Sequence, residues 1–182
     1  MLTSLVRKTL EIYLGESRLI TQSEFPEETL TESQKKESVF VTLYHEGRVI
    51  ASSGRIQCKK ENTLFECIDN TLLCLKDERF APSLQSPDML GKIQIRVDRF
   101  VSENRRMLTS IDSLDIRTEG ILFLSQNLGV LSIILPNMVH VGSTPQAYFE
   151  LACTKAGVDP KKLDSRDYNI YGLTTVSETD FE

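Results

Sequence analysis

Two apolar segments separated by a two-residue turn constrain the fold more than any other feature of the sequence. Residues 39–44 are β-branched, aromatic or aliphatic, and residues 48–51 resume the pattern after Glu46 and Gly47. This arrangement predicts an antiparallel β-hairpin. Because both segments are apolar on both faces, we expect the hairpin to be central in its sheet and covered on both sides. Residues 52–54 (Ser-Ser-Gly) then form an irregular exit from the second strand.

The remaining pattern favours a mixed fold over a doubly wound one. Strands and helices do not alternate regularly, and short turns join several strands, which is typical of an antiparallel α+β protein. We expect helices over residues 2–14, 62–79 and 144–157, and further strands over residues 92–100, 121–124, 128–135 and 168–176.

Periodicity also predicts which side chains are buried. In the second helix, the apolar stripe that begins at Leu64 leaves Glu66 and Asn70 facing elsewhere. In the strand that follows, Arg96 and Asp98 alternate with apolar residues, which predicts a half-exposed face.

Length and composition are typical of one globular domain. The chain has 182 residues, of which 40% are hydrophobic and 26% are charged. This predicts a single domain over residues 1–182 that buries a core without a disulfide or a metal. We expect residues 16–37 to form a surface connection with a short helical turn at Pro26, and residues 177–182 to form a frayed tail.

The charge and hydropathy patterns argue against two classes of partner. The net charge is −5, and the basic pairs are spread along the chain, whereas a nucleic-acid binder concentrates positive charge. No apolar run approaches the ~20 residues that span a bilayer. We therefore expect a cytoplasmic protein with neither a nucleic-acid nor a membrane partner.

Complete signatures for catalysis or cofactor binding are missing from the sequence. It has no P-loop, no G-x-G-x-x-G after a strand, no G-x-S-x-G elbow and no H-E-x-x-H. The cysteines include no C-x-x-C pair, so we predict buried thiols rather than a metal site, and no cofactor. They are Cys58, Cys67, Cys74 and Cys153.

Ser52 and Ser53 are the candidate catalytic residues, because they lie beside Gly54 at the end of an apolar strand. A serine nucleophile needs an activating base within hydrogen-bond reach. His45 lies on the preceding strand, but the turn places the residue opposite His45 well before Ser52. The sequence therefore predicts no serine–histidine pair.

Asp77 and Arg79 close the second predicted helix. Residues two apart do not face each other on a helix, so we expect each side chain to find another partner. Arg79 is placed to bond the last helical carbonyls, and Phe80 is expected in the core.

Several segments together resemble the AMMECR domain family. Residues 77–82 (Asp-Glu-Arg-Phe-Ala-Pro) are similar to the family's DPRFPP element, and residues 135–136 to its LPQ. Residues 153–157 resemble its cysteine-containing KAG helix end, and the hairpin at residues 40–47 resembles its opening strand and turn. The order and spacing of these segments carry the resemblance over residues 39–171.

The family's hallmark hexapeptide, LRGCIG, corresponds to residues 49–54 (Val-Ile-Ala-Ser-Ser-Gly), here called the hallmark segment. Only Gly54 matches outright. The family's arginine, first glycine, cysteine and isoleucine correspond to Ile50, Ala51, Ser52 and Ser53. A cation and a thiol are lost together, and Arg55 supplies a cation only from a shifted position.

The resemblance implies two unequal lobes, each with its own antiparallel sheet, and a hallmark segment that faces the cleft between them. Relatives are often encoded beside, or fused to, Memo-type and radical-SAM proteins, which implies a shared modification pathway. The candidate binding residues are Ile50, Ala51, Ser52, Ser53, Gly54, Arg55, Asp77 and Arg79.

Two hypotheses follow for the function. The first is an accessory protein whose cleft binds a small molecule or a protein partner, because the hallmark segment has lost its arginine and cysteine. The second is a hydrolase or modifying enzyme that uses Ser52 or Ser53 with residues 77–79. We favour the first.

Overall fold

The computed structural model describes residues 1–138 and 141–181, with the side chains of residues 101–104 left out of the description. The chain divides into two compact units. Unit 1 comprises Met1–Phe100 and Val176–Glu182, and unit 2 comprises Val101–Thr175. None of the described helices has the length and apolarity needed to cross a bilayer.

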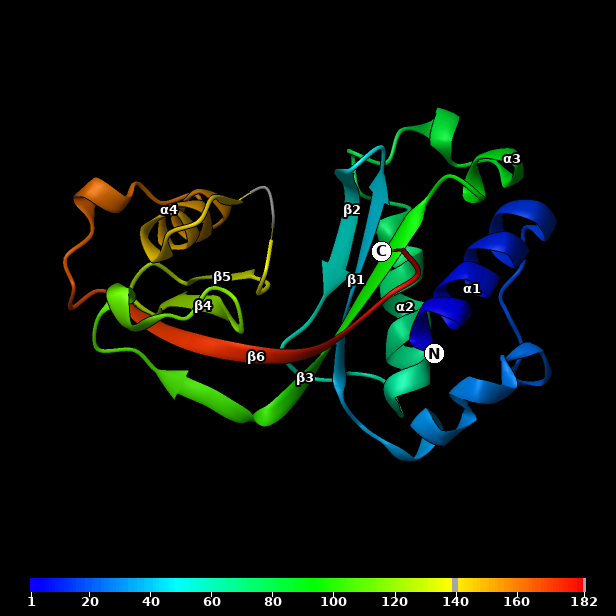
Figure 1. Cartoon of the computed structure of the whole chain (residues 1–182), viewed down its shortest axis with the longest axis horizontal. Helices are drawn as coiled ribbons and strands as arrows, with labels where there is room; N and C mark the ends of the chain where they lie inside the picture. Colours follow the sequence, from blue (N-terminus) through cyan, green and yellow to red (C-terminus); the bar gives the residue numbers. More distant parts are fainter. Residues whose placement is uncertain (139–140, 182) are drawn as a thin grey trace. The chain divides into compact units, whose positions relative to one another are not determined.

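Helices and strands follow one another in an irregular order (Figure 1). The α-helices are α1 (Leu2–Glu16), α2 (Thr63–Cys74), α3 (Pro87–Leu90) and α4 (Pro145–Lys155). The strands are β1 (Ser38–His45), β2 (Arg48–Gly54), β3 (Gln94–Met107), β4 (Glu119–Ser125), β5 (Val130–Ile134) and β6 (Asn169–Thr179). Short 3-10 helices include η2 (Glu27–Gln34), at the turn predicted from Pro26, and η6 (Pro160–Lys162).

Hydrogen bonds join six strands in the order β2-β1-β3-β6-β4-β5. The prediction of an antiparallel α+β fold with flanking helices is confirmed. The resemblance implied a separate sheet in each lobe. The structure instead has one six-stranded sheet, and its strands β3 and β6 each contribute residues to both units.

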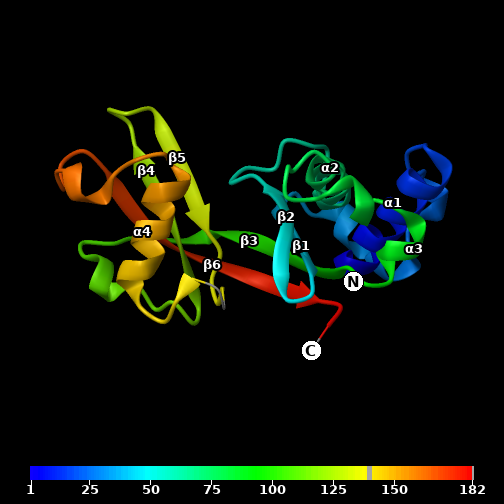
Figure 2. The ribbon, with the colours of Figure 1, turned by 90° about the horizontal axis from the view of Figure 1, so that it is seen from above.

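In unit 1, α2 packs on β1 and β2, and α1 packs against α2 (Figures 1 and 2). The apolar positions of α1 recur at helical spacing, so one stripe of the helix is fully buried. In unit 2, α4 packs on β4 and β5. Apolar side chains from the facing elements fill a separate core in each unit.

The hairpin forms as predicted, with Glu46 and Gly47 in the turn. Two details of the prediction are wrong. The exit at residues 52–54 is regular strand, because these residues pair with residues 40–42 of β1. In addition, β2 is an edge strand rather than a central one, since β1 is its only neighbour among the described strands.

The polar residues that were expected to face solvent are buried. In α2, Glu66 and Asn70 are 0% exposed, because Asn70 hydrogen-bonds β1 and β2 and Glu66 hydrogen-bonds Arg55 in the segment after β2. In β3, Asp98 is 0% and Arg96 is 7% exposed, because each neutralises the other. Burying an unpaired charge costs free energy, and the hydrogen-bonded partners of these residues offset that cost. Hydrophobic periodicity does not take such partners into account.

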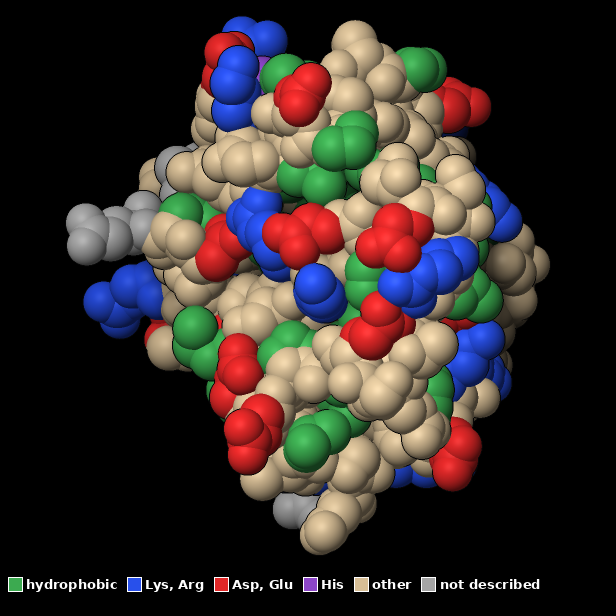
Figure 3. Space-filling model, turned by 90° about the vertical axis from the view of Figure 1, so that its right-hand side faces the viewer, with side chains coloured by type: hydrophobic (Ala, Val, Ile, Leu, Met, Phe, Trp, Pro, Cys, Tyr) green, Lys and Arg blue, Asp and Glu red, His purple; other side chains and the backbone are tan. Residues whose placement is uncertain are grey.

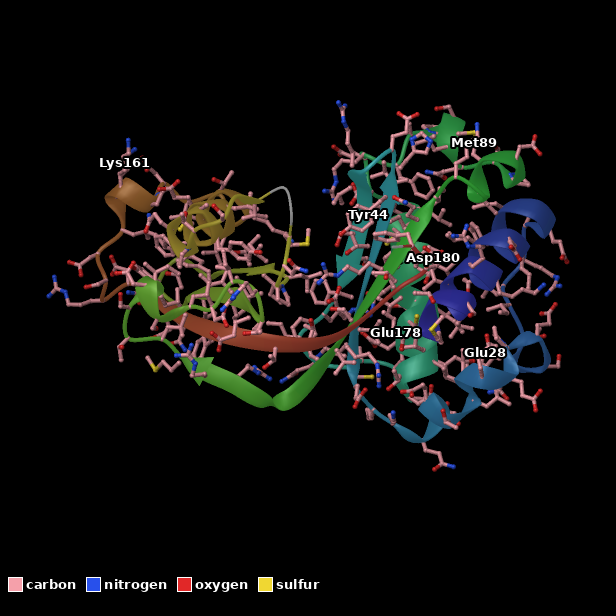
Figure 4. The ribbon with its side chains drawn as sticks, in the orientation of Figure 1. Glu28, Tyr44, Met89, Lys161, Glu178 and Asp180 are labelled. Atoms are coloured by element: carbon pink, nitrogen blue, oxygen red, sulfur yellow. The ribbon has the colours of Figure 1, made fainter. Side chains whose placement is uncertain are left out.

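The C-terminal segment also differs from the frayed tail that was expected. Residues 177–179 belong to β6, and Asp180 accepts a hydrogen bond from the Ile95 amide at 2.6 Å. Glu178 accepts from the Leu2 amide at 2.7 Å, so this segment joins α1 to β3 within unit 1 (Figure 4). Specific partners, rather than apolar content, order these polar residues.

Candidate functional site

Strand alternation divides the hallmark segment between two faces of the sheet. Ser52 lies directly opposite Thr42, which in turn lies opposite Arg96, so the three residues form one cross-strand row. The hydroxyl oxygens of Ser52 and Thr42 are 3.3 Å apart. Ser53 projects to the other face, toward α2, where its hydroxyl donates to Asn70 Oδ1 at 3.2 Å.

A β-bulge directs two hallmark residues into the core. The strand register shifts between Leu43 and Tyr44, which face Ala51 and Val49, so Ile50 is the extra residue. Ile50 is 8% and Ala51 is 0% exposed, and both belong to the core of unit 1. Ile50 therefore contributes an apolar core side chain rather than a surface group.

Arg55 is not a free cation. Its guanidinium donates to Glu66 Oε1 at 2.9 Å and also bonds Asp69, so two carboxylates from α2 neutralise it. Lys60 pairs with the same Asp69 at 2.8 Å. The cluster of Arg55, Lys60, Glu66 and Asp69 has no net charge, which argues against Arg55 as a replacement for the lost arginine.

Glu66 is the centre of this cluster. Its carboxylate accepts the amides of Lys59 and Lys60 at 2.8 and 3.0 Å as well as the Arg55 guanidinium. Burial by itself raises the pKa of Glu66, but the bonds from Arg55 and the two amides outweigh it and lower the pKa below its usual value. Glu66 is therefore ionised, and it ties the segment after β2 to α2.

Asp77 and Arg79 pair with each other, contrary to the prediction. Helix α2 ends at Cys74, so residues 77–79 form a turn in which Arg79 Nε and Nη2 donate to the Asp77 carboxylate at 2.9 and 2.6 Å. Residues two apart can meet here because the backbone is no longer helical. Phe80 is 2% exposed and lies in the core, as expected.

The same carboxylate protects the open edge of the sheet. Asp77 Oδ2 accepts the Ser52 amide at 3.1 Å, and β2 has no neighbouring strand on that side. Exposed edges invite pairing with other chains, and a charged group placed against the edge prevents it. The turn at residues 77–80 thus braces the hallmark segment.

We expect Asp77→Asn to lower the free energy of unfolding by about 1 kcal/mol at neutral pH, after discounting for the half-exposed Arg79. The hydrogen bonds from Arg79, with those from the Arg79 and Ser52 amides, lower the pKa of Asp77 from 3.8 to about 2. Because the pKa of Asp77 is lower in the folded protein than in the unfolded chain, the ionised carboxylate stabilises the fold at pH values above about 4. This stabilisation disappears as the pH falls from about 4 toward 2. Urea unfolding across that range measures it.

Glu78→Gln is the matched control, since Glu78 is the exposed neighbour in the same turn. This variant should match the wild type at every pH. A constant difference between Asp77→Asn and wild type from pH 7 down to pH 2 would show that the charge of Asp77 plays no part.

Sequence reasoning missed Tyr44, Arg96 and Asp98 as functional candidates on the sheet face of Ser52. Arg96 donates to Asp98 through two bonds of 2.8 Å, and Ser177 of β6 donates to the same carboxylate. Tyr44 also bonds Arg96, and burial raises the pKa of the tyrosine. We call Thr42, Tyr44, Ser52, Arg96 and Asp98 the polar face. The Arg-x-Asp spacing in a strand, which puts both charges on one face, was the available signal.

The thiols offer no alternative nucleophile. Cys67 and Cys74 are fully buried, as predicted, and burial raises the pKa of Cys74 to about 12. Burial also raises the pKa of Cys58, despite the neighbouring lysines. No group of three or more His, Cys, Asp or Glu within the described ranges could hold a metal ion.

His45 does not form a catalytic pair with Ser52. His45 faces Arg48 across the hairpin turn, whereas Ser52 faces Thr42. His140, expected to be a loop residue, lies outside the described residues. Neither serine hydroxyl bonds a histidine, a lysine or a carboxylate in the part of the chain that the structure describes.

The AMMECR1 family model matches residues 3–176. The chain belongs to the AMMECR1 family. It is also similar in fold to the uncharacterized protein PH0010 from Pyrococcus horikoshii, whose crystal structure superposes with a TM-score of 0.79 at 20% sequence identity. That match covers 97% of this chain and 88% of the other. No curated protein sequence matches.

The structure connects two of the segments that carry the family resemblance. The AMMECR1 hallmark segment and the turn at residues 77–80 are far apart in the chain, and the bond from Ser52 to Asp77 joins them. Of the predicted binding residues, Ser52 lies on the polar face and Arg79 is 54% exposed beside it. Ile50, Ala51, Ser53 and Arg55 are held by the core or by α2.

Proposed function

We propose that this AMMECR1 protein is an accessory protein that binds a small molecule or a protein partner, with Ser52, Tyr44 and Arg79 in contact with the ligand. One observation carries the proposal. The carboxylate that hydrogen-bonds the hallmark segment, that of Asp77, is occupied by the Ser52 amide and by Arg79. It stabilises the strand and is not placed to take a proton from a hydroxyl.

The groups beside Ser52 suit recognition. Ser52 offers a half-buried hydroxyl, Tyr44 a phenol on the same face, and Arg79 a guanidinium that is 54% exposed. The charged pair beneath them, Arg96 and Asp98, is already neutralised. Few oriented polar groups over a rigid sheet are typical of binding sites. The inter-lobe cleft that the family resemblance implies stays a prediction.

The two serines provide a matched test, because they are neighbours that point to opposite faces. A library of polar fragments is titrated into ¹⁵N-labelled protein, and shifts are followed at Ser52, Thr42 and Tyr44. We expect Ser52→Ala to weaken the fragments that bind there by about 5- to 10-fold, the loss of one hydrogen bond. Ser53→Ala, on the α2 face, should leave them unchanged. Equal effects of both substitutions, or of neither, would contradict the proposal.

The alternative is an enzyme that uses Ser52, and the contact between Ser52 and Asp77 is the observation in its favour. Because a serine without a base is a weak nucleophile, we expect no covalent adduct after incubation with a fluorophosphonate reagent. Intact-mass spectrometry measures this. An adduct that disappears in Ser52→Ala but persists in Ser53→Ala would favour the enzyme instead.

A further inference from the structure

A pocket that no part of the hallmark segment touches lies entirely within unit 2. Its volume is about 540 Å³, within the range of small-molecule sites. The walls come from the end of β3 with the turn that follows, from α4, and from the start of β6 with the loop before it. All of these residues fall between Met107 and Ile170.

We propose that this pocket is a second ligand site, which takes an uncharged, flat aromatic molecule with an amide-like hydrogen-bonding edge. The site is independent of the proposed function at Ser52. Its chemistry follows from three features of the lining: the aromatic rings, the absence of charge and the free polar groups.

The first feature is the aromatic wall. Phe149 and Tyr168 both line the pocket, with ring centroids 5.3 Å apart and planes inclined by 40°. Phe123 supports Tyr168 from the core at 5.4 Å. Rings held in this way are rigid platforms on which another aromatic ring packs favourably.

The second feature is charge. None of the lining residues is an aspartate, glutamate, lysine, arginine or histidine, although 26% of the chain is charged. An ionised ligand that leaves water for this pocket would find no counter-charge. By contrast, Lys and Arg side chains are interspersed with Asp and Glu on the face of the molecule in Figure 3.

The third feature is a set of polar side chains without internal partners. Among the described residues, Thr109, Ser165 and Asn169 make no side-chain hydrogen bond within the chain. Gln146 also lines the pocket, and its amide bonds only the exposed Glu150. Two carboxamides and two hydroxyls match a ligand edge that both donates and accepts.

Three probes of similar size separate these features. Benzamide is flat and neutral, benzoate has the same shape with a charge, and cyclohexanecarboxamide has the same amide on a ring that is not flat. Each is titrated into the ¹⁵N-labelled full chain, with shifts followed at Thr109, Gln146 and Asn169. We expect benzamide to bind in the millimolar range, benzoate about 10-fold more weakly, and cyclohexanecarboxamide about 5-fold more weakly.

Variants assign the binding to the pocket. Gln146→Leu, on the exposed first turn of α4, should weaken benzamide at least threefold without affecting folding. Tyr168→Leu should weaken it further, and its near-UV circular dichroism reports whether the core is retained. Lys161→Ala is the control, because Lys161 projects outward from η6 and does not line the pocket (Figure 4).

Each outcome decides the proposal. It is supported if benzamide shifts these amides and Gln146→Leu weakens it while Lys161→Ala does not. It is overturned if benzamide causes no shifts at these amides or shifts only elsewhere, if benzoate or cyclohexanecarboxamide binds as tightly as benzamide, or if Gln146→Leu has no effect. Shifts confined to Ser52 and Tyr44 would support the proposed function and reject the second site.

Discussion

Replacing Glu66 with alanine is expected to lower the free energy of unfolding by about 3–5 kcal/mol, the usual effect of removing one partner from a buried ion pair. The side chain is 0% exposed, and it accepts hydrogen bonds from Arg55 and from the amides of Lys59 and Lys60. Its removal leaves a partly buried guanidinium with one remaining carboxylate, and two amides without an acceptor. Urea denaturation at pH 7 measures the loss.

Asp69→Ala is the matched control, since Asp69 bonds the same Arg55 from the same helix but is 26% exposed. We expect a loss of about 1 kcal/mol or less, as for exposed ion pairs. The lowered pKa of Glu66 gives a second readout: its contribution is present at neutral pH and is lost as the pH falls through the acid range. Similar losses for the two variants would reject the central role of Glu66.

Gly54→Ala is expected to destabilise the fold by about 2–3 kcal/mol through overpacking. A Cβ atom at this position would lie 2.1 Å from Cγ of Phe40, the ring atom nearest the backbone. Rotation of the ring about its own axis cannot relieve this contact. Phe40 is also 7% exposed and packs edge-on against Phe100 at 5.2 Å, so the ring has no room to move.

Gly91→Ala is the control for the general effect of removing a glycine. No atom lies within 4 Å of a Cβ at this position, and its φ of −62° suits any residue. We expect it to be neutral or about 0.5 kcal/mol more stable, because alanine restricts the unfolded chain. In the Gly54→Ala/Phe40→Ala double variant, which removes the clashing Cγ, the combined loss should be smaller than the sum of the single losses. Strict additivity would refute the steric explanation.

The prediction for Gly54 and the β-bulge at Ile50 give two hallmark residues structural roles. Gly54 is needed to accommodate the Phe40 ring, because a Cβ atom at this position would overlap it. Ile50, which stands at the position of the family's arginine, is a core residue because the β-bulge turns it inward. Ser52 is the hallmark residue whose side chain lies on the polar face, where its hydroxyl contacts that of Thr42.

Local patterns were enough to predict most of the secondary structure. The hairpin, α1 and α4 carry strong signals: β-branched alternation around Glu46 and Gly47, a helical stripe in α1, and a Thr144 cap followed by proline in α4. Such signals depend on residues within a few positions of one another. The family resemblance rested on the same kind of short segments.

The burial of polar residues could not be predicted in this way. Glu66 looks like a surface residue in any window of sequence, and it is buried because Arg55 and the amides of Lys59 and Lys60 satisfy its charge. Arg96 and Asp98 satisfy each other within one strand, and their Arg-x-Asp spacing was the only local signal of that pairing. The open edge of β2 was also missed. Whether a strand has one neighbour or two depends on the order of all the strands.

The sequence by itself determined an antiparallel α+β chain of the AMMECR1 type. The tertiary structure decided what the candidate site residues do. It placed Ser52 and Ser53 on opposite faces, neutralised Arg55 on α2, and brought Asp77 to the Ser52 amide. The physical reason is that residues form hydrogen bonds and ion pairs with groups that are close in space. The strand register and the β-bulge determine which groups are close, and most of these partners are distant in the sequence.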